Sequence, residues 1–325
     1  VEAFGPTTER LEPEAVQALT QPGWDLFHRG GKRWRPLLMT LVCEALGGGG
    51  RALALTPLVE FPHTASLIHD DIEDNADQRR GEPAVHIRYG TDTAINSGAF
   101  LYFLALACIK PWDAPAELKN QAFAVWGDAM RRLHLGQAMD IHWHRDFSSL
   151  PSLEAYDRMC RLKTGSLARL AALIGVLAAS PEGTSSPERA SPGTVLGQAA
   201  ENVGVGFQIL DDVKNLTTGN PGKKRGDDVV EGKKSLPVLL YLSRHPDRRS
   251  WVSHCFSAAR QGGSGVAEVE ALIQALTESG DLSEAAARGR ALITEAQTVF
   301  THIPGATQSG EAVALLQGLL GFIQG

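Results

Sequence analysis

The stretches HTASLIHDDIED, residues 63–74, and FQILDDVKN, residues 207–215, decide the fold and function that this sequence predicts. Each carries acidic side chains inside an apolar segment that has the period of a helix. In a helix, positions i and i+4 lie on one face, about 6 Å apart along the axis. Carboxylates so placed repel one another and resist burial unless cations lie among them. One such cluster is most simply a solvated helix face, but two copies in apolar context argue against that explanation.

Oxygen ligands clustered in this way suit Mg²⁺, which commonly binds through one or two carboxylates and substrate phosphates and keeps several waters. The main predicted metal ligands are Asp70, Asp74 and Asp211. The full predicted set is Asp70, Asp71, Asp74, Asp211, Asp212 and Asn215. Asn215 brings a neutral amide oxygen, which can ligate a metal or hold a metal-bound water but removes one charge from the site.

Basic residues lie in the segments around both clusters. GGKRWRP, residues 30–36, places a lysine and two arginines directly after two glycines. Glycines let backbone N–H groups approach a phosphate, and the start of a helix favours an anion. Arg79 and Arg80 follow the first cluster, Lys163 lies between the clusters, and a run rich in lysine and arginine spans residues 223–234. Carboxylates for metal ions and cations for phosphates together indicate a magnesium diphosphate site.

Six motifs in a fixed order resemble the trans-isoprenyl diphosphate synthases, the head-to-tail polyprenyl synthetases. They are GGKRWRP, HTASLIHDDIEDNADQRRG, GQAMDIHWH, KTGSL, FQILDDVKNL and GDDVVEGKKSLPVLL, and they span residues 30–240. Within that family, SLIHDDIEDNADQRRGEPAVHIRYG and the asparagine of the second acidic motif look most like the eukaryotic-type geranylgeranyl diphosphate synthases. The resemblance implies an all-α, single-domain helical bundle around a central cavity, with residues 1–325 as one polyprenyl synthetase domain.

The resemblance also implies a role for each charged side chain. Isopentenyl diphosphate would be held by Lys32, Arg35, His63 and Arg80. The allylic diphosphate would be held by a second set: Arg79, Lys163, Thr164, Gln208, Lys223 and Lys233. The catalytic residues, with three Mg²⁺ ions implied per active site, would be Asp70, Asp74, Asp211, Lys163 and Arg79.

These roles imply head-to-tail prenyl transfer. Ionisation of dimethylallyl, geranyl or farnesyl diphosphate gives a carbocation and a pyrophosphate, which metal ions and cationic side chains stabilise. The double bond of isopentenyl diphosphate then attacks the cation, and the expected product is geranylgeranyl diphosphate. Product length would depend on small residues one turn before the first cluster and on a deeper floor that matches the eukaryotic-type enzymes: Ala65, Ser66, Tyr102, Phe103 and His134. Without that match, the two aromatic residues would simply be core.

Two other functions remain open. A class I terpene cyclase also ionises diphosphates at an aspartate-rich motif, but it needs only one diphosphate site. Its N-x₃-S-x₃-E pattern is missing here, because Gly219 and Lys223 follow Asn215 at those spacings. A non-catalytic partner subunit would be expected to lose catalytic charges, and only Asn215 suggests such a loss. An assay with isopentenyl diphosphate and an allylic primer distinguishes the three.

Composition narrows the function classes further. The net charge of −6 argues against a nucleic-acid binder, which normally carries a basic face. The longest apolar run, residues 94–109, is too short and too mixed to span a membrane, which takes about 20 residues. Four cysteines without paired or metal-ligand spacing suit a reducing compartment, so we expect a cytoplasmic protein. The resemblance implies a homodimer or larger homo-oligomer, formed through helices near residues 91–109.

The apolar period is helical almost throughout, and no convincing hairpin signal interrupts it. Residues 52–75 are expected to form a helix that Pro62 kinks or breaks early, and residues 91–109, apolar nearly all round, a central helix. Residues 181–193, rich in Pro, Ser and Gly, predict a loop. Further helices are expected over 114–145, 152–180, 190–217, 231–244, 251–260, 264–279, 281–302 and 308–323.

We predict that Asp70→Ala or Asp211→Ala nearly abolishes turnover and leaves the fold intact. Loss of a metal ligand removes stabilisation of the leaving group, while the relief of carboxylate repulsion favours folding. Steady-state kinetics together with thermal unfolding measures both effects. A near-native rate in either variant would refute the model of two metal-binding clusters.

Overall fold

The computed structural model describes residues 12–145, 147, 150–180, 187–219, 224–303 and 310–325. The described chain is almost entirely helical, as predicted, with one two-stranded hairpin. The first half comprises α1 (Pro13–His28), α2 (Trp34–Ala45), the 3-10 helix η2 (Gly49–Leu55), α3 (Pro57–Glu73), β1 (Gln78–Arg79), β2 (Glu82–Pro83), α4 (Val85–Tyr89), α5 (Thr91–Ala105), the 3-10 helix η3 (Leu106–Cys108) and α6 (Ala116–Arg145). The second half comprises α7 (Leu153–Cys160), the π-helical turn η4 (Arg161–Gly165), α8 (Ser166–Ala179), α9 (Pro187–Thr217), α10 (Asp227–Glu231), α11 (Leu236–Arg244), the 3-10 helix η5 (Pro246–Arg248), α12 (Arg249–Gly262), α13 (Ala267–Glu278), α14 (Asp281–Thr301) and α15 (Gly310–Gln324).

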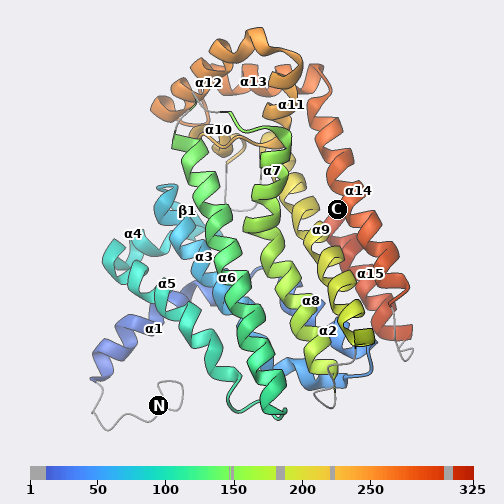
Figure 1. The fold of residues 1–325 in the computed structure, drawn as a ribbon. Helices are drawn as coiled ribbons and strands as arrows, with labels where there is room; N and C mark the ends of the chain where they lie inside the picture. The colour runs from blue at the N-terminus through green and yellow to red at the C-terminus, as the bar shows by residue number, and fades with distance from the viewer. Residues whose placement is uncertain (1–11, 146, 148–149, 181–186, 220–223, 304–309) are drawn as a thin grey trace.

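Long helices form the body of the molecule, and shorter ones cover one end (Figure 1). α9 packs along α14 and α8, α8 packs against α2 and α6, and α3 packs against α5. The largest apolar core joins α2, α3, α5, α6 and α8, and a separate core lies among α10 to α13. α12 and α13 cross the top of the bundle in Figure 1. The two acidic motifs therefore sit on α3 and α9, which belong to the same bundle.

The predicted helix over residues 52–75 breaks early, at Thr56, between η2 and α3. Pro57 starts α3, where its missing N–H costs nothing, and the helix then continues through Pro62 to the acidic motif. α9 begins at Pro187, so the helix extends into the predicted 181–193 loop, of which residues 181–186 lie outside the described chain. The helical period of the sequence therefore located the motif-bearing helices correctly.

A hairpin that the sequence analysis missed follows the first acidic motif. β1 and β2 pair antiparallel, and both residues of the connecting turn have positive φ, 54° at Arg80 and 78° at Gly81. Two positive φ angles at the centre of a two-residue loop are typical of type I′ hairpin turns. The hairpin places Arg79 in a strand and Arg80 at the turn.

The prediction of a central helix over residues 91–109 is wrong for the single chain. α5 lies at the edge of the bundle in Figure 1, and Ile95 and Phe103 are 48% and 71% exposed. Apolar residues all round a helix call for burial on every side, but here one side of α5 has no covering helix from the described chain.

One stretch, Leu153–Ala179, is long and apolar enough to cross a membrane by length and composition. It runs through α7, η4 and α8, and 67% of its most apolar window is buried inside the fold. α8 packs there against α2, α6 and α9, as expected of the core helix of a globular protein.

Two helices, α6 and α9, approach η4 with unusually little space between the backbones. A Cβ at Gly136 of α6 would overlap the backbone at Leu162 and Lys163, and a Cβ at Gly204 of α9 would lie 2.7 Å from the Cα of Gly165. Only glycine fits at such close approaches. π-Helical turns are rare and frequently occur at functional sites. The backbone of η4 is therefore fixed from two sides.

Candidate active site

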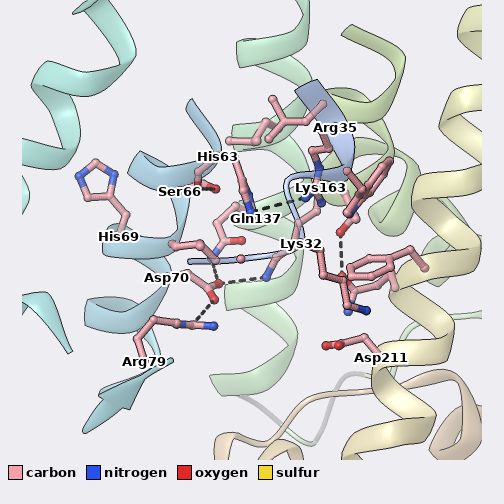
Figure 2. A pocket seen from close by; sticks show the side chains of 18 of the residues that line it. Lys32, Arg35, His63, Ser66, His69, Asp70, Arg79, Gln137, Lys163 and Asp211 are labelled. Carbon is pink, nitrogen blue, oxygen red and sulfur yellow. Dashed lines mark hydrogen bonds and ion pairs between the residues drawn. The ribbon is translucent and has the colours of Figure 1, made fainter. Parts of the chain in front are cut away.

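A cavity of about 410 Å³ lies between α2, α3, α6, η4 and α9. Most of the residues that the sequence singled out line it: Lys32, Arg35, His63, Ser66, Asp70, Arg79, Arg80, Tyr102, His134, Lys163, Thr164, Gln208, Asp211, Asp212 and Lys233. Figure 2 shows Asp70 and Asp211 projecting from different helices on opposite sides of this space. The structure thus brings the two acidic motifs, distant in sequence, to one cavity.

Asp70 lies at the centre of a charged cluster. One of its oxygens accepts hydrogen bonds from Gln137 Nε2 at 3.0 Å and Lys163 Nζ at 3.2 Å, and the other is 3.5 Å from the Arg79 guanidinium. Asp71 is fully buried and accepts from Arg79 Nε at 2.7 Å. Burial lowers the pKa of Arg79, but Asp71 and Asp70 outweigh it and raise the pKa, so Arg79 stays charged. Asp71 therefore positions Arg79 and does not line the cavity.

Lys163 is held by a carboxylate that the sequence analysis did not single out. Its Nζ lies 2.6 Å from Asp140 of α6, within the GQAMD motif, and 3.2 Å from Asp70. Burial lowers the pKa of Lys163, but the two carboxylates reverse the effect and raise it. Burial by itself would raise the pKa of Asp140, but Lys163 and Lys233 outweigh burial and lower the pKa, so Asp140 is ionised. Lys163 is thus a permanent cation aimed at the cavity.

Asp74 and Lys233 form the next charge pair, 3.1 Å apart, and Glu231 lies 2.6 Å from the same Nζ. Burial raises the pKa of Asp74 to about 6, and Asp70 adds to the rise, although Lys233 opposes both. The Asp74 carboxylate is 2% exposed and is not part of the cavity lining. The structure also distinguishes the two neighbouring lysines, because Lys234 instead lies over the rings of Phe147 and Phe256.

The second acidic motif divides its residues between the cavity and the fold. Asp211 and Asp212 line the cavity, and Asp212 accepts hydrogen bonds from Tyr156 at 2.7 Å and Gln208 at 2.8 Å. Burial raises the pKa of Asp212 to about 6, which these two hydrogen bonds oppose. Asn215 is fully buried outside the cavity lining, and its side-chain oxygen accepts from the backbone N–H of Asp228. In this structure Asn215 connects α9 to α10, so the structure does not bring this predicted ligand to the cavity.

The basic side of the cavity is formed by α2 and the hairpin. The Arg35 guanidinium stacks on Trp34 and lies 3.5 Å from His63 Nε2. Burial lowers the pKa of Arg35 to about 10 and, together with the nearby arginines, holds the pKa of His63 well below its usual value, so that His63 is neutral. Arg80 donates to the carbonyls of Leu26 and Gly30, which connects the hairpin turn to the loop before α2.

Several further residues of the basic side were not predicted. Arg33 has a positive φ of 50°, stacks on Phe27 and pairs with Glu60, which is a buried carboxylate among arginines. Lys32 lies over Phe207 and over Phe322 of the last helix. Glu60 lies three residues before His63 and therefore on the same helical face, so the sequence spacing alone indicates that the two side chains are neighbours. The unpredicted polar residues lining the cavity are Arg33, Glu60, His69, Glu73, Gln137, Lys214 and Asp228.

The predicted floor is only partly at the cavity. Tyr102 and His134 line it with their ring centroids 5.2 Å apart, and Ser66 lies nearby on α3. Ala65 is fully buried and does not line it. The prediction that Phe103 forms part of the floor is wrong, because its side chain is 71% exposed and lies outside the cavity lining. Consecutive residues in a helix are separated by about 100°, so Tyr102 and Phe103 cannot both face inward. Lys223 lies outside the described residues.

The donors fit a hard divalent cation that binds together with phosphate. In the described part of the chain, no three His, Cys, Asp or Glu side chains gather into a ready-made metal cage. Asp70 and Asp211 instead lie on separate walls, with Lys163, Arg79 and Lys32 around them. Mg²⁺ is commonly bound by one or two carboxylates plus substrate phosphates and waters, which suits walls of this kind. The fold and site thus define an all-helical protein built to bind metal diphosphates.

The polyprenyl synthetase family model matches residues 16–276, and the chain belongs to this family. It is 33% identical to geranylfarnesyl diphosphate synthase of Aeropyrum pernix, over 92% of this chain and 91% of that protein. It is 36% identical to a geranylgeranyl pyrophosphate synthase of the fungus Eremothecium gossypii, over 73% and 72%. A crystal structure of a Caulobacter crescentus polyprenyl synthase, complexed with calcium and isoprenyl diphosphate, superposes with a TM-score of 0.79 at 25% identity and covers 97% of this chain and 90% of that one.

These comparisons confirm the predicted family, the likeness to eukaryotic-type geranylgeranyl synthases and the all-helical fold. The chain is a trans-prenyltransferase of the chain-elongating type, and divalent metal with diphosphate is bound within the family. The role of each individual side chain stays a prediction.

We predict that Asp74→Asn stabilises the metal-free protein at pH 7–8 by roughly 1–3 kcal/mol. The folded-state pKa of Asp74, about 6, is raised above its ordinary value of 3.8. Ionisation of the wild-type carboxyl therefore destabilises the fold progressively as the pH rises from about 4 to above 6. Thermal unfolding in a chelator across this range measures the difference, which should vanish near pH 4. Asp113→Asn, at an exposed position, is the control for loss of one negative charge. A constant difference at every pH would contradict the prediction.

Proposed function

We propose that this protein condenses isopentenyl diphosphate with an allylic diphosphate, head to tail, to make geranylgeranyl diphosphate. The observation that carries the proposal is the pairing of two acidic walls with two groups of cations in one cavity. A class I cyclase needs only one diphosphate site, so Lys32, Arg35 and Arg80 would have no substrate to hold. A non-catalytic partner would have no need of buried cations kept charged, as Arg79 and Lys163 are.

The allylic diphosphate would bind between the acidic walls, with its phosphates on Arg79, Lys163 and Lys233. Mg²⁺, expected at three ions per active site, would be held by Asp70 and Asp211 and would neutralise charge on the leaving pyrophosphate. Asp74 would also bind a metal ion once the incoming phosphates attract Lys233 away from it. Lys163, fixed by Asp140, places a positive charge where the pyrophosphate charge develops.

Isopentenyl diphosphate would bind on the basic side, on Lys32, Arg35, His63 and Arg80. As the allylic C1–O bond breaks, its electron pair leaves with the pyrophosphate. The terminal double-bond carbon of isopentenyl diphosphate then bonds to C1, and a proton passes from its C2 to the pyrophosphate. Each cycle adds five carbons, and no nucleophilic side chain is required.

The proposed product has 20 carbons, because Ser66 is small and the paired rings of Tyr102 and His134 line the same cavity and would form its floor. Fungal geranylgeranyl synthases among the relatives support this length. A 25-carbon product is the second candidate, since the Aeropyrum relative is named a geranylfarnesyl synthase. A packed ring stops growth because another isoprene unit would have to displace side chains, at about 1–3 kcal/mol.

We predict that the purified protein, given isopentenyl and farnesyl diphosphates with Mg²⁺, makes mainly geranylgeranyl diphosphate, and that Tyr102→Ala and His134→Ala lengthen the product. Chromatography of the dephosphorylated products against length standards gives the result. Phe103→Ala is the matched control, because it removes a neighbouring ring that faces away from the cavity. It should leave product length unchanged in enzyme whose assembly, measured by sedimentation, is the same as that of the wild type. Wild-type enzyme that leaves farnesyl diphosphate unextended, or no change of product length in either floor variant, would refute the floor; a cyclic hydrocarbon would refute the synthase itself.

We also propose that residues 1–325 act as one catalytic domain and pair with a second copy through α5 and α6, where Ile95, Phe103 and Phe123 are exposed. Apolar exposure along α5 supports a protein partner on this side. Sedimentation equilibrium should give the mass of two chains or more. Ile95→Lys should reduce this mass, whereas Leu53→Lys, at an exposed apolar residue of η2, should not. A single-chain mass for the wild type would disprove the pairing. The cytoplasmic location stays an expectation.

A further inference from the structure

Tyr156 is a buried tyrosine that no motif includes. It lies on α7, is 2% exposed, and donates its hydroxyl hydrogen to the Asp212 carboxylate at 2.7 Å. Asp212 is itself 5% exposed. A buried carboxylate is costly unless hydrogen-bonded, and bonds to an ionised acceptor are about twice as strong as neutral ones. The hydroxyl of Tyr156 therefore has a specific partner in the second acidic motif, across a helix–helix contact.

The Tyr156–Asp212 bond is one end of a chain of hydrogen bonds. The other oxygen of Asp212 accepts from Gln208 Nε2 at 2.8 Å, and Gln208 Oε1 accepts from the Thr164 hydroxyl at 2.7 Å. Every donor in this chain points toward Asp212, as an acceptor-only carboxylate requires. The chain joins α7, α9 and η4, and three of its members line the cavity: Thr164, Gln208 and Asp212.

This arrangement assigns both oxygens of Asp212 to protein donors. Asp211, the residue before Asp212 on α9, lines the same wall of the cavity. Without the tyrosine hydroxyl, one oxygen of a buried carboxylate would lose its donor. Asp212 would then turn toward other donors or water, and Gln208 and Thr164 would lose their common anchor.

We propose that Tyr156 is a positioning residue of the allylic diphosphate site: its hydroxyl fixes Asp212, and through Asp212 it orients Gln208 and Thr164 toward the cavity. The inference rests on the proposed function, because it names the substrate that this wall holds. Tyr156 touches neither substrate. The effect of its hydroxyl is thus expected on the allylic side and not on Lys32 and Arg35 across the cavity.

The test is Tyr156→Phe, which keeps the ring and removes the hydroxyl. We expect the KM for farnesyl diphosphate to rise about tenfold, as for other outer partners of binding groups, with the KM for isopentenyl diphosphate unchanged. Tyr241→Phe is the matched control, since Tyr241 is also buried but stacks on His245 and Trp251 outside the cavity lining. Equal KM values in Tyr156→Phe and wild type, or equal rises for both substrates, would overturn the proposal.

A double-mutant cycle shows whether Tyr156 acts through its partner. In an Asp212→Asn background, Tyr156→Phe should raise the KM for farnesyl diphosphate much less than in the wild type, because the interaction is already altered. Fully additive effects would refute the link.

Binding without turnover separates this inference from the proposed function. Calorimetry with farnesyl thiodiphosphate and Mg²⁺ should show the same affinity loss in Tyr156→Phe. A wild-type chain that binds this analogue but elongates nothing would refute the synthase and leave the positioning role standing. A variant that binds it as tightly as the wild type would refute the positioning role, even in an active synthase.

Discussion

The contact on which the site depends is the one between Lys163 and the carboxylates of Asp140 and Asp70. Two carboxylates can lie this close together in a largely buried site because the Lys163 ammonium between them offsets part of their charge. Asp140 also pairs with the lysine, so that a metal ion bound by Asp70 in the proposed function would not leave Lys163 as an unpaired buried charge. The same logic governs Asp71 with Arg79 and Asp74 with Lys233. In the metal-free protein, the cations that would bind phosphate therefore act as counter-ions for the carboxylates that would bind metal.

Under the proposed function, metal and substrate would act together on these pairs. Metal ions would take the carboxylates, and the phosphates would take the cations that the carboxylates release. Burial raises the pKa of Asp74 and of Asp212 to about 6, so in the metal-free protein it destabilises the ionised form of both side chains. On the basic side the shift has the opposite direction: burial and the surrounding arginines both disfavour the proton of His63 and lower its pKa, so that His63 is neutral.

The sequence was sufficient for the helices and most of the cavity, because a helical period fixes which residues share a face. It could not tell which members of an acidic motif face the cavity: Asp70 does, whereas Asp71 and Asn215 are turned into the fold by Arg79 and by the backbone of Asp228. Asp140 and Tyr156 were missed because their partners are distant in sequence. Phe103 was misplaced because an all-apolar helix gives no sign of which side is covered, and the hairpin because two residues per strand leave no alternation to detect.

The close backbone contacts around η4 divide the cavity into a part that can vary and a part that cannot. Lys163 and Thr164 are carried on a turn where neighbouring helices meet at glycines, with no side chain between them to resize. Tyr102 and His134, by contrast, line the cavity with two ring side chains that contact each other. If the proposed floor is correct, substitutions there would change the space for the hydrocarbon tail while the backbone at η4 stays fixed. With such an arrangement, related enzymes would differ in product length by changing a few side chains while the backbone that carries Lys163 and Thr164 stays the same.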